Sequence, residues 1–214
     1  MKTWADFLDD LMPELPGADV PIVEAALVRA AIEFCDKARV YRGDHPAIDA
    51  VAEQGTYSWE PTEENVEVCH IFHVWYAGEQ LTPRSGEYLA DTYDYWPEET
   101  GTPAHYHVER TDALIVVPAP AEALEDAIVA KVALRPTLDA TGIPDDLFAE
   151  YRGAIAAGAM SRLMRMQKKP WTNYEMANAY GQAFRSAIED ASHRMQAGHV
   201  RSAHYVANGR KRFL

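Results

Sequence analysis

The spacing of apolar residues changes twice along this 214-residue chain, from a helical period to an alternating one and back. Near the N-terminus, and again after residue 144, apolar side chains recur every three or four positions, which is typical of amphipathic helices. Between about residues 55 and 135 apolar and polar side chains alternate, which indicates β-strands. The fold therefore has to combine helix packing with strand pairing.

The N-terminal region contains two predicted helices. A short one runs from Thr3 to about Met12, and Pro13, Pro16 and Gly17 end it. A longer helix opens at Pro21 and ends at residues 43–46, where the sequence is Gly-Asp-His-Pro. Its apolar stripe consists of Val23, Leu27, Ala30, Phe34, Ala38 and Tyr41.

The central region reads as strands. The longest candidate is residues 66–76, whose apolar content predicts burial on much of both faces. Further candidates are an alternation around Tyr57 and Trp59, and the segments His105–Arg110, Ala113–Val117 and Ile128–Arg135. Residues 81–95 fit neither pattern.

The C-terminal region contains two more helices, from Pro144 to about Met166 and from Thr172 to about Gly198. Residues 172–175 have the form of a capping box, which predicts that the second helix starts at Thr172. The link of residues 168–171, Lys-Lys-Pro-Trp, is short, so the two helices are expected to form an antiparallel hairpin.

These patterns predict an α+β fold in which an antiparallel helical bundle carries a β-rich insertion. The N-terminal helices (residues 1–46) and the C-terminal hairpin (residues 139–198) form the bundle, because each apolar stripe needs a partner. Residues 47–138 form the insertion, and residues 199–214 form an extended basic tail.

Charge is divided unevenly along the chain. Residues 1–150 hold 30 acidic and 9 basic side chains, whereas residues 151–214 hold 11 basic and 3 acidic ones. Such asymmetry indicates that the two parts face different partners. The acidic part should repel phosphates, and the basic end should seek an acidic surface. The net charge of −13 also predicts that isolated subunits resist association until a partner offsets the repulsion.

Composition narrows the class of protein. Hydrophobic residues make up 48% of the chain, enough for a real core. No apolar run reaches the length of a membrane span, and no apolar leader follows Lys2. Cys35 and Cys69 make no disulfide framework. We therefore expect a soluble protein, made in a reducing cytoplasm and without a membrane partner.

A histidine pattern suggests one enzymatic alternative. On a strand, His105, His107 and Glu109 share a face, and two imidazoles with a carboxylate can bind zinc or iron. This resembles part of a cupin motif, so a metal-dependent β-barrel enzyme is the competing hypothesis. His70 and His73 are separated by an odd number of positions and point to opposite faces.

Other catalytic signatures are absent from the sequence. It has no Gly-x-Ser-x-Gly elbow, and the glycines at 153 and 158 lack the Lys-Ser/Thr of a phosphate loop. We expect both cysteines to have a structural role and no catalytic one. The main expectation is a protein without enzymatic activity, cofactor or metal.

Basic residues near the C-terminus form a candidate docking surface. Arg162, Arg165 and Lys169 are spaced three and four apart, which places them on one side of a helix. The tail ends in Lys-Arg-Phe-Leu, and a basic peptide with two terminal apolar residues suits an acidic groove of a partner. Nucleic-acid binding and an unbound, solvated tail remain as alternatives for these residues.

At this point several segments, in order, resemble the head-to-tail adaptor (head completion, or connector) proteins of tailed bacteriophages. These segments are Leu27–Cys35, Thr56–Pro61, Leu114–Pro120, Gly142–Pro144 leading into Leu147 and Tyr151, Ala154–Met166, and Lys169–Trp171 with Ala179, Tyr180 and Phe184. They are packing patterns that cover most of the chain.

The resemblance implies a structural protein of the virion, made in the host bacterium. Such adaptors form a ring of about twelve copies beneath the portal protein, and DNA passes through the ring without sequence-specific binding. The side away from the portal receives the next tail component, a nozzle, tube or stopper protein. An acidic channel wall would not retain DNA phosphates.

The resemblance also implies that C-terminal segments contact the portal. In this sequence the expected docking residues lie in the link between the last two helices and in the tail. They are Lys168, Lys169, Trp171, Arg201, Arg210, Lys211, Arg212, Phe213 and Leu214.

Overall fold

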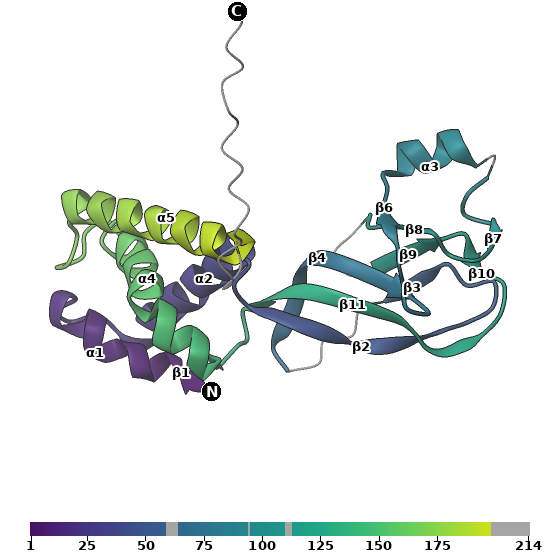
Figure 1. The fold of residues 1–214 in the computed structure, drawn as a ribbon. Helices are drawn as coiled ribbons and strands as arrows, with labels where there is room; N and C mark the ends of the chain where they lie inside the picture. Colours follow the sequence, from purple (N-terminus) through teal and green to yellow (C-terminus); the bar gives the residue numbers. More distant parts are fainter. Residues whose placement is uncertain (59–63, 94, 110–112, 198–214) are drawn as a thin grey trace, which may run out of the picture.

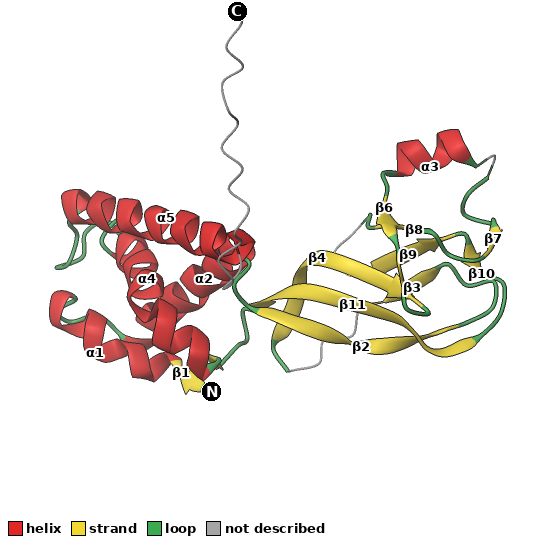
Figure 2. Ribbon diagram, in the orientation of Figure 1, coloured by secondary structure: helices red, strands yellow, loops and turns green. Residues whose placement is uncertain are grey.

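The fold was analysed in a computed structural model, which describes residues 1–58, 64–93, 95–109 and 113–197. The molecule is elongated, with helices gathered at one end and strands at the other (Figures 1 and 2). We call residues 1–41 and 139–197 the helical module, and residues 42–138 the β module.

Three long helices build the helical module: α2 (Val20–Ala38), α4 (Asp145–Leu163) and α5 (Tyr174–Ala197). Phe34 of α2 contacts both other helices, since its ring lies 5.0 Å from that of Tyr151 and 6.1 Å from that of Phe184. The short α1 (Leu8–Leu11), between 3₁₀ turns at Trp4–Phe7 and Met12–Glu14, covers the same core.

The N-terminus is tied to the start of α4 by two short strands. β1 (Lys2–Thr3) pairs antiparallel with β12 (Gly142–Ile143). The indole nitrogen of Trp4 donates a hydrogen bond of 2.5 Å to the carbonyl oxygen of Ala140. This pairing needs glycine at position 142, because a Cβ there would lie 2.0 Å from the carbonyl oxygen of Lys2.

Two four-stranded sheets dominate the β module. One has the order β2 (Arg42–Ala50), β11 (Leu124–Pro136), β4 (Val66–Tyr76) and β5 (Glu79–Gln80), with antiparallel pairing throughout. The other has the order β3 (Thr56–Ser58), β9 (Ala113–Val117), β8 (His105–His107) and β6 (Thr82–Pro83).

Smaller elements complete the end of the β module that is remote from the long helices. The short helix α3 (Gly86–Thr92) lies beyond the second sheet (Figure 1). β7 (Thr100–Gly101) and β10 (Ala119–Pro120) form a parallel pair close to it. Residues 81–95, which fitted no single pattern, thus contain both a strand and a helix.

The prediction of a helical bundle with a β-rich insertion is wrong. Strands form four sheets and hold 30% of the described residues, against 42% in helices. The reason is that the β module has a hydrophobic core of its own. That core contains Ala50, Tyr57, Val66, Val68, Val74, Leu81, Tyr106, Leu114, Val116, Ala127, Ile128, Ala130, Val132 and Leu134.

The expected helix end at residues 43–46 lies inside strand β2, so this prediction is wrong. Pro46 is compatible with this strand because β2 is an edge strand and needs no second row of backbone bonds. The preceding helix ends at Ala38, and Arg39 adopts a left-handed conformation with φ of 54°. Two expected strand residues, Trp59 and Arg110, lie outside the described residues.

Arg135 connects the two modules from strand β11. Its Nη1 atom lies 3.0 Å from Oδ1 of Asp36 in α2, and its Nε atom lies 2.7 Å from Oε1 of Glu67 in β4. Helix α2 also packs directly on β11. The helical module and the larger sheet are therefore joined through side chains as well as through the chain itself.

Candidate functional site

The expected docking link joins α4 to α5 at the outer end of the hairpin. Lys168 has a φ of 58°, and the hydroxyl of Thr172 donates to the carbonyl oxygen of Met166 and accepts from the backbone N–H of Lys169. Helix α5 begins at Tyr174 and not at Thr172, and the side chain of Asn173 accepts from the N–H of Met176. The link therefore has a defined backbone.

The three predicted docking residues of the link differ in exposure. The side chain of Trp171 is 5% exposed and belongs to the core of the helical module. Lys168 and Lys169 are exposed, and the Nζ atom of Lys169 lies 5.6 Å from the centre of the Trp171 indole. Trp171 thus anchors the link, and the two lysines are the groups that a partner can reach.

The six predicted docking residues of the tail lie outside the described residues. They are Arg201, Arg210, Lys211, Arg212, Phe213 and Leu214. Helix α5 ends at Ala197, before the first of them.

A groove with a volume of about 380 Å³ lies where α2, α4 and α5 meet. We call it the arginine groove; it is lined by Glu33, Lys37, Gly158, Ser161, Arg162, Arg165, Gly181, Phe184 and Arg185. Arg162 and Arg165 belong to the basic stripe that the sequence predicts. Sequence reasoning missed Lys37 and Arg185, since residues from three helices meet here only after folding.

Four basic side chains and one carboxylate line the arginine groove. Glu33 forms ion pairs with Arg162 and with Lys37, whose Nζ atom is 2.5 Å away. Burial acts to raise the pKa of Glu33, but the bonds and charges of Lys37 and Arg162 outweigh it, so the pKa is lowered. Arg165 donates to the side chain of Asn178 at 3.2 Å.

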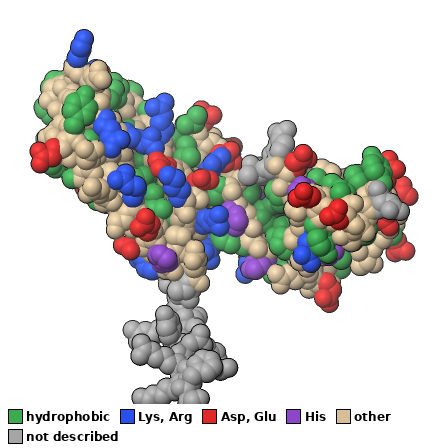
Figure 3. Space-filling model, turned by 90° about the horizontal axis from the view of Figure 1, so that it is seen from above, with side chains coloured by type: hydrophobic (Ala, Val, Ile, Leu, Met, Phe, Trp, Pro, Cys, Tyr) green, Lys and Arg blue, Asp and Glu red, His purple; other side chains and the backbone are tan. Residues whose placement is uncertain are grey.

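Acidic side chains concentrate in the β module. Its sequence, residues 42–138, holds 18 acidic and 5 basic residues, whereas the helical module holds 15 and 11. In the view of Figure 3, Lys and Arg gather over the helices, and Asp and Glu gather at the far end of the strands. Residues 1–41 pack with residues 139–197, so in the folded protein the excess of acidic residues lies mainly in the β module.

The end of the β module carries acidic and aromatic side chains together. We call this surface the acidic tip; its exposed residues are Glu87, Tyr88, Asp91, Tyr95, Glu98 and Glu99. Glu87 and Asp91 lie one turn apart on α3. Tyr88 and Tyr95 are 40% and 60% exposed.

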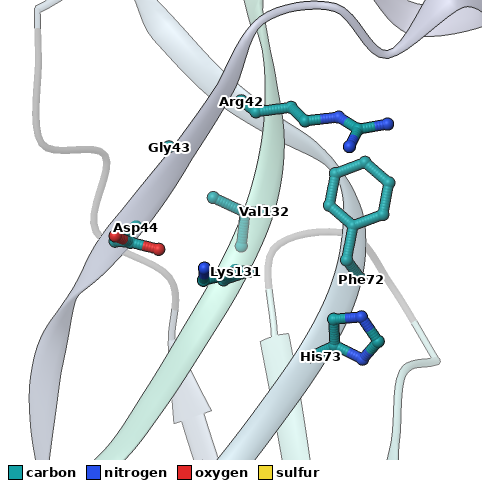
Figure 4. A pocket seen from close by; sticks show the side chains of 7 residues that line it. All are labelled: Arg42, Gly43, Asp44, Phe72, His73, Lys131 and Val132. Carbon is teal, nitrogen blue, oxygen red and sulfur yellow. The ribbon is translucent and has the colours of Figure 1, made fainter. Parts of the chain in front are cut away.

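A second hollow, of about 440 Å³, lies against the larger sheet near its junction with the helices (Figure 4). Arg42 reaches over Phe72, with its guanidinium carbon 4.5 Å from the ring centre. Its Nη2 atom donates to the carbonyl oxygen of Met195 in α5 at 3.1 Å. Because Arg42 contacts both Phe72 in the sheet and Met195 in α5, we interpret the hollow as part of the junction between the modules.

The histidines of the metal hypothesis contact protein groups instead of one another. The ring of His107 bonds through Nδ1 to the carbonyl oxygen of Arg84, and His105 packs against Tyr88 and Tyr93. Within residues 1–58, 64–93, 95–109 and 113–197, no three His, Cys, Asp or Glu side chains are placed to share a metal ion. The geometry gives the metal-dependent enzyme no support.

The molecule thus combines a helical module that has a basic groove with an acidic β module. Comparison with protein families shows that the chain belongs to the SU10 adaptor protein family, whose model matches residues 2–209. The sequence-based resemblance to phage head-to-tail adaptors is confirmed. No curated protein matches the chain.

Family membership defines the kind of protein. It is a bacteriophage adaptor, a structural component of the virion that interacts with other head and tail components, and the family is not one of enzymes. Among the helices of the described residues, none has the length and apolar character needed to cross a membrane.

Proposed function

We propose that this chain is one subunit of a ring that lies beneath the portal protein and links it to the tail. The ring holds about twelve copies, and DNA passes through its channel during ejection. The side away from the portal receives a nozzle, tube or stopper protein. The observation that carries the proposal is the family match together with the division of charge between the two modules.

The acidic β module supports a role in DNA passage. With 18 acidic and 5 basic residues, it repels phosphates and cannot hold a polyanion by charge. A channel wall of this character lets DNA slide. In this proposal DNA passes through the channel without sequence-specific contacts.

The basic end of the chain supports portal attachment. Lys168 and Lys169 are exposed at the outer end of the α4–α5 hairpin, and Trp171 holds the link in place. The tail adds Arg201, Arg210, Lys211, Arg212, Phe213 and Leu214. In the proposal these residues together bind the portal.

Truncation after Gly198 tests the attachment. Every described helix and strand lies before this point, so the shortened chain is expected to keep the circular dichroism spectrum and melting temperature of the full chain. Its binding to portal-bearing heads is expected to be lost. A truncated chain that attaches normally would show that the tail is not the docking segment.

A further inference from the structure

We infer that the arginine groove receives the acidic tip of a neighbouring copy of this chain. This contact is the one that repeats between subunits around the ring, so the inference rests on the proposed function. It assigns two surfaces on opposite modules to one interface.

The groove holds more positive charge than its own residues neutralise. Glu33 is already shared by Lys37 and Arg162. Among the described residues, neither Arg165 nor Arg185 forms an ion pair, and both are exposed. Two guanidinium groups so placed match a pair of carboxylates, because each can bind one through two parallel hydrogen bonds.

Two glycines line the groove, and one of them, Gly181, lies close to both arginines. A Cβ on Gly181 would lie 3.6 Å from Nη2 of Arg165 and 3.6 Å from Nη1 of Arg185, so the two guanidinium groups converge over this position. A Cβ on Gly158 would lie 2.8 Å from the ring of Phe184. Glycine backbone, the hydroxyl of Ser161 and an aromatic ring therefore line the groove together with the cationic side chains.

The acidic tip offers the complementary chemistry. Glu87 and Asp91 are one helical turn apart and exposed on α3. Residues 85–99 contain five acidic side chains and no basic one. The exposed ring of Tyr95 adds a face over which an arginine can stack, whereas the ring of Tyr88 already has the guanidinium carbon of Arg84 4.3 Å from its centre. Arginine and tyrosine are enriched among the residues that dominate protein interfaces.

Only another copy can bring these two surfaces together. The groove lies between the long helices and the tip lies at the far end of the β module, so they cannot meet within one chain (Figures 1 and 3). A contact between two different surfaces of identical subunits is head-to-tail, and it builds a ring when the rotation between neighbouring subunits closes. The chain's own tail is basic and would be repelled by the groove, and DNA would be repelled by the net charge of −13.

Charge reversal on both sides tests the inference. The groove variant is Arg165→Glu with Arg185→Glu, and the tip variant is Glu87→Arg with Asp91→Arg. Full-length chains are mixed with the cognate portal, treated with a short amine–carboxylate crosslinker and digested. Mass spectrometry then counts links between copies from Lys37 in the groove to Glu98 or Glu99 in the tip, because none of the variants changes these reactive groups. Each variant should lose such links by on the order of tenfold, and a chain that carries all four changes should regain them.

Arg29→Glu is the matched control, since Arg29 is exposed on α2 and lies outside the groove; it should crosslink like the unaltered chain. The inference is overturned if both variants link normally, if the fourfold variant is not rescued, or if the groove links to the portal instead. The binding of each variant to the portal is measured in an assay separate from the crosslinking. If the unaltered chain makes no links between copies on the portal, the proposed ring itself fails.

Discussion

Phe184 of α5 lies against the backbone of Gly158 in α4, where a Cβ on Gly158 would come within 2.8 Å of the Cε2 atom of the phenyl ring. The same Cβ would lie 3.0 Å from the Cβ of Ala30 in α2. The three long helices thus meet at a point where only glycine fits.

Gly158→Ala should therefore destabilise the protein by about 1–2 kcal/mol, because overpacking outweighs the better helix propensity of alanine. Gly153→Ala is the matched control in the same helix. Position 153 has no atom within 4 Å of a Cβ, so this change should stabilise by about 0.5–1 kcal/mol. Urea unfolding measures both, and effects of the same sign would contradict the packing described here.

Gly142→Ala should displace the N-terminal strand, because its Cβ would collide with the carbonyl group of Lys2. A loss of about 2 kcal/mol or more in unfolding free energy is expected, with faster proteolysis before α2. Gly43→Ala serves as a strand control, since its Cβ would lie 3.4 Å from a side-chain carbon of Leu134. Equal effects of the two changes would argue against a special role for the β1–β12 pair.

Arg135→Met should loosen the junction of the two modules while leaving both folded. Its ion pairs with Asp36 and Glu67 are partly exposed, so their loss should cost only about 1 kcal/mol. Hydrogen exchange should rise at the α2–β11 contact. Lys131→Met changes an exposed residue on the same strand and should leave exchange at this contact unchanged. A similar rise in exchange in the Lys131→Met variant would mean that the loss of any charge on β11 loosens the junction.

Both cysteines should resist alkylation in the folded protein. Burial raises the pKa of Cys35 to about 12 and that of Cys69 to about 11, so almost no thiolate forms at pH 8. Mass spectrometry after iodoacetamide treatment should find both thiols free, and both should react once the protein is unfolded in guanidinium. Rapid labelling of native Cys69 would show that its strand opens.

His70 should make the junction sensitive to acid. Burial lowers its pKa from the ordinary value of 6.5, and the charges of Arg39 and Arg42 lower it further. The neutral ring accepts a hydrogen bond from Nη1 of Arg39 at 3.2 Å. The unfolded chain binds this proton more readily, so the stabilisation is present above pH 6.5 and is lost as pH falls through the folded pKa.

Melting curves at pH 7.5 and 5.5 check this dependence. His70→Gln keeps an acceptor for Arg39 but cannot gain a proton, so it should lose less stability than the unaltered protein across this range. An identical loss in both proteins would assign the acid sensitivity to other groups.

Local patterns predicted the helices well. The stripe that contains Leu27 and Phe34 lies in α2, and the short link before Thr172 turns α4 back into α5, because helical periodicity and loop length are properties of neighbouring residues. The β module was underestimated for the same reason. Pro46 reads locally as a turn residue, and only its place on an edge strand makes the segment part of a sheet.

The sequence by itself determined the family, the helix and strand periods and the uneven charge, because each is carried by residue types at fixed spacing. Only the tertiary structure decided that Lys37, Arg165 and Arg185 line one groove and that Trp171 is buried beneath Lys169. The groove depends on contacts between α2 and α4, which lie more than 100 residues apart in the chain. The spacing of residues within one helix indicates which face is apolar and buried, but not which residues of another helix lie beside it. Basic residues are equally well hydrated on any exposed face, so their spacing does not predict a shared groove.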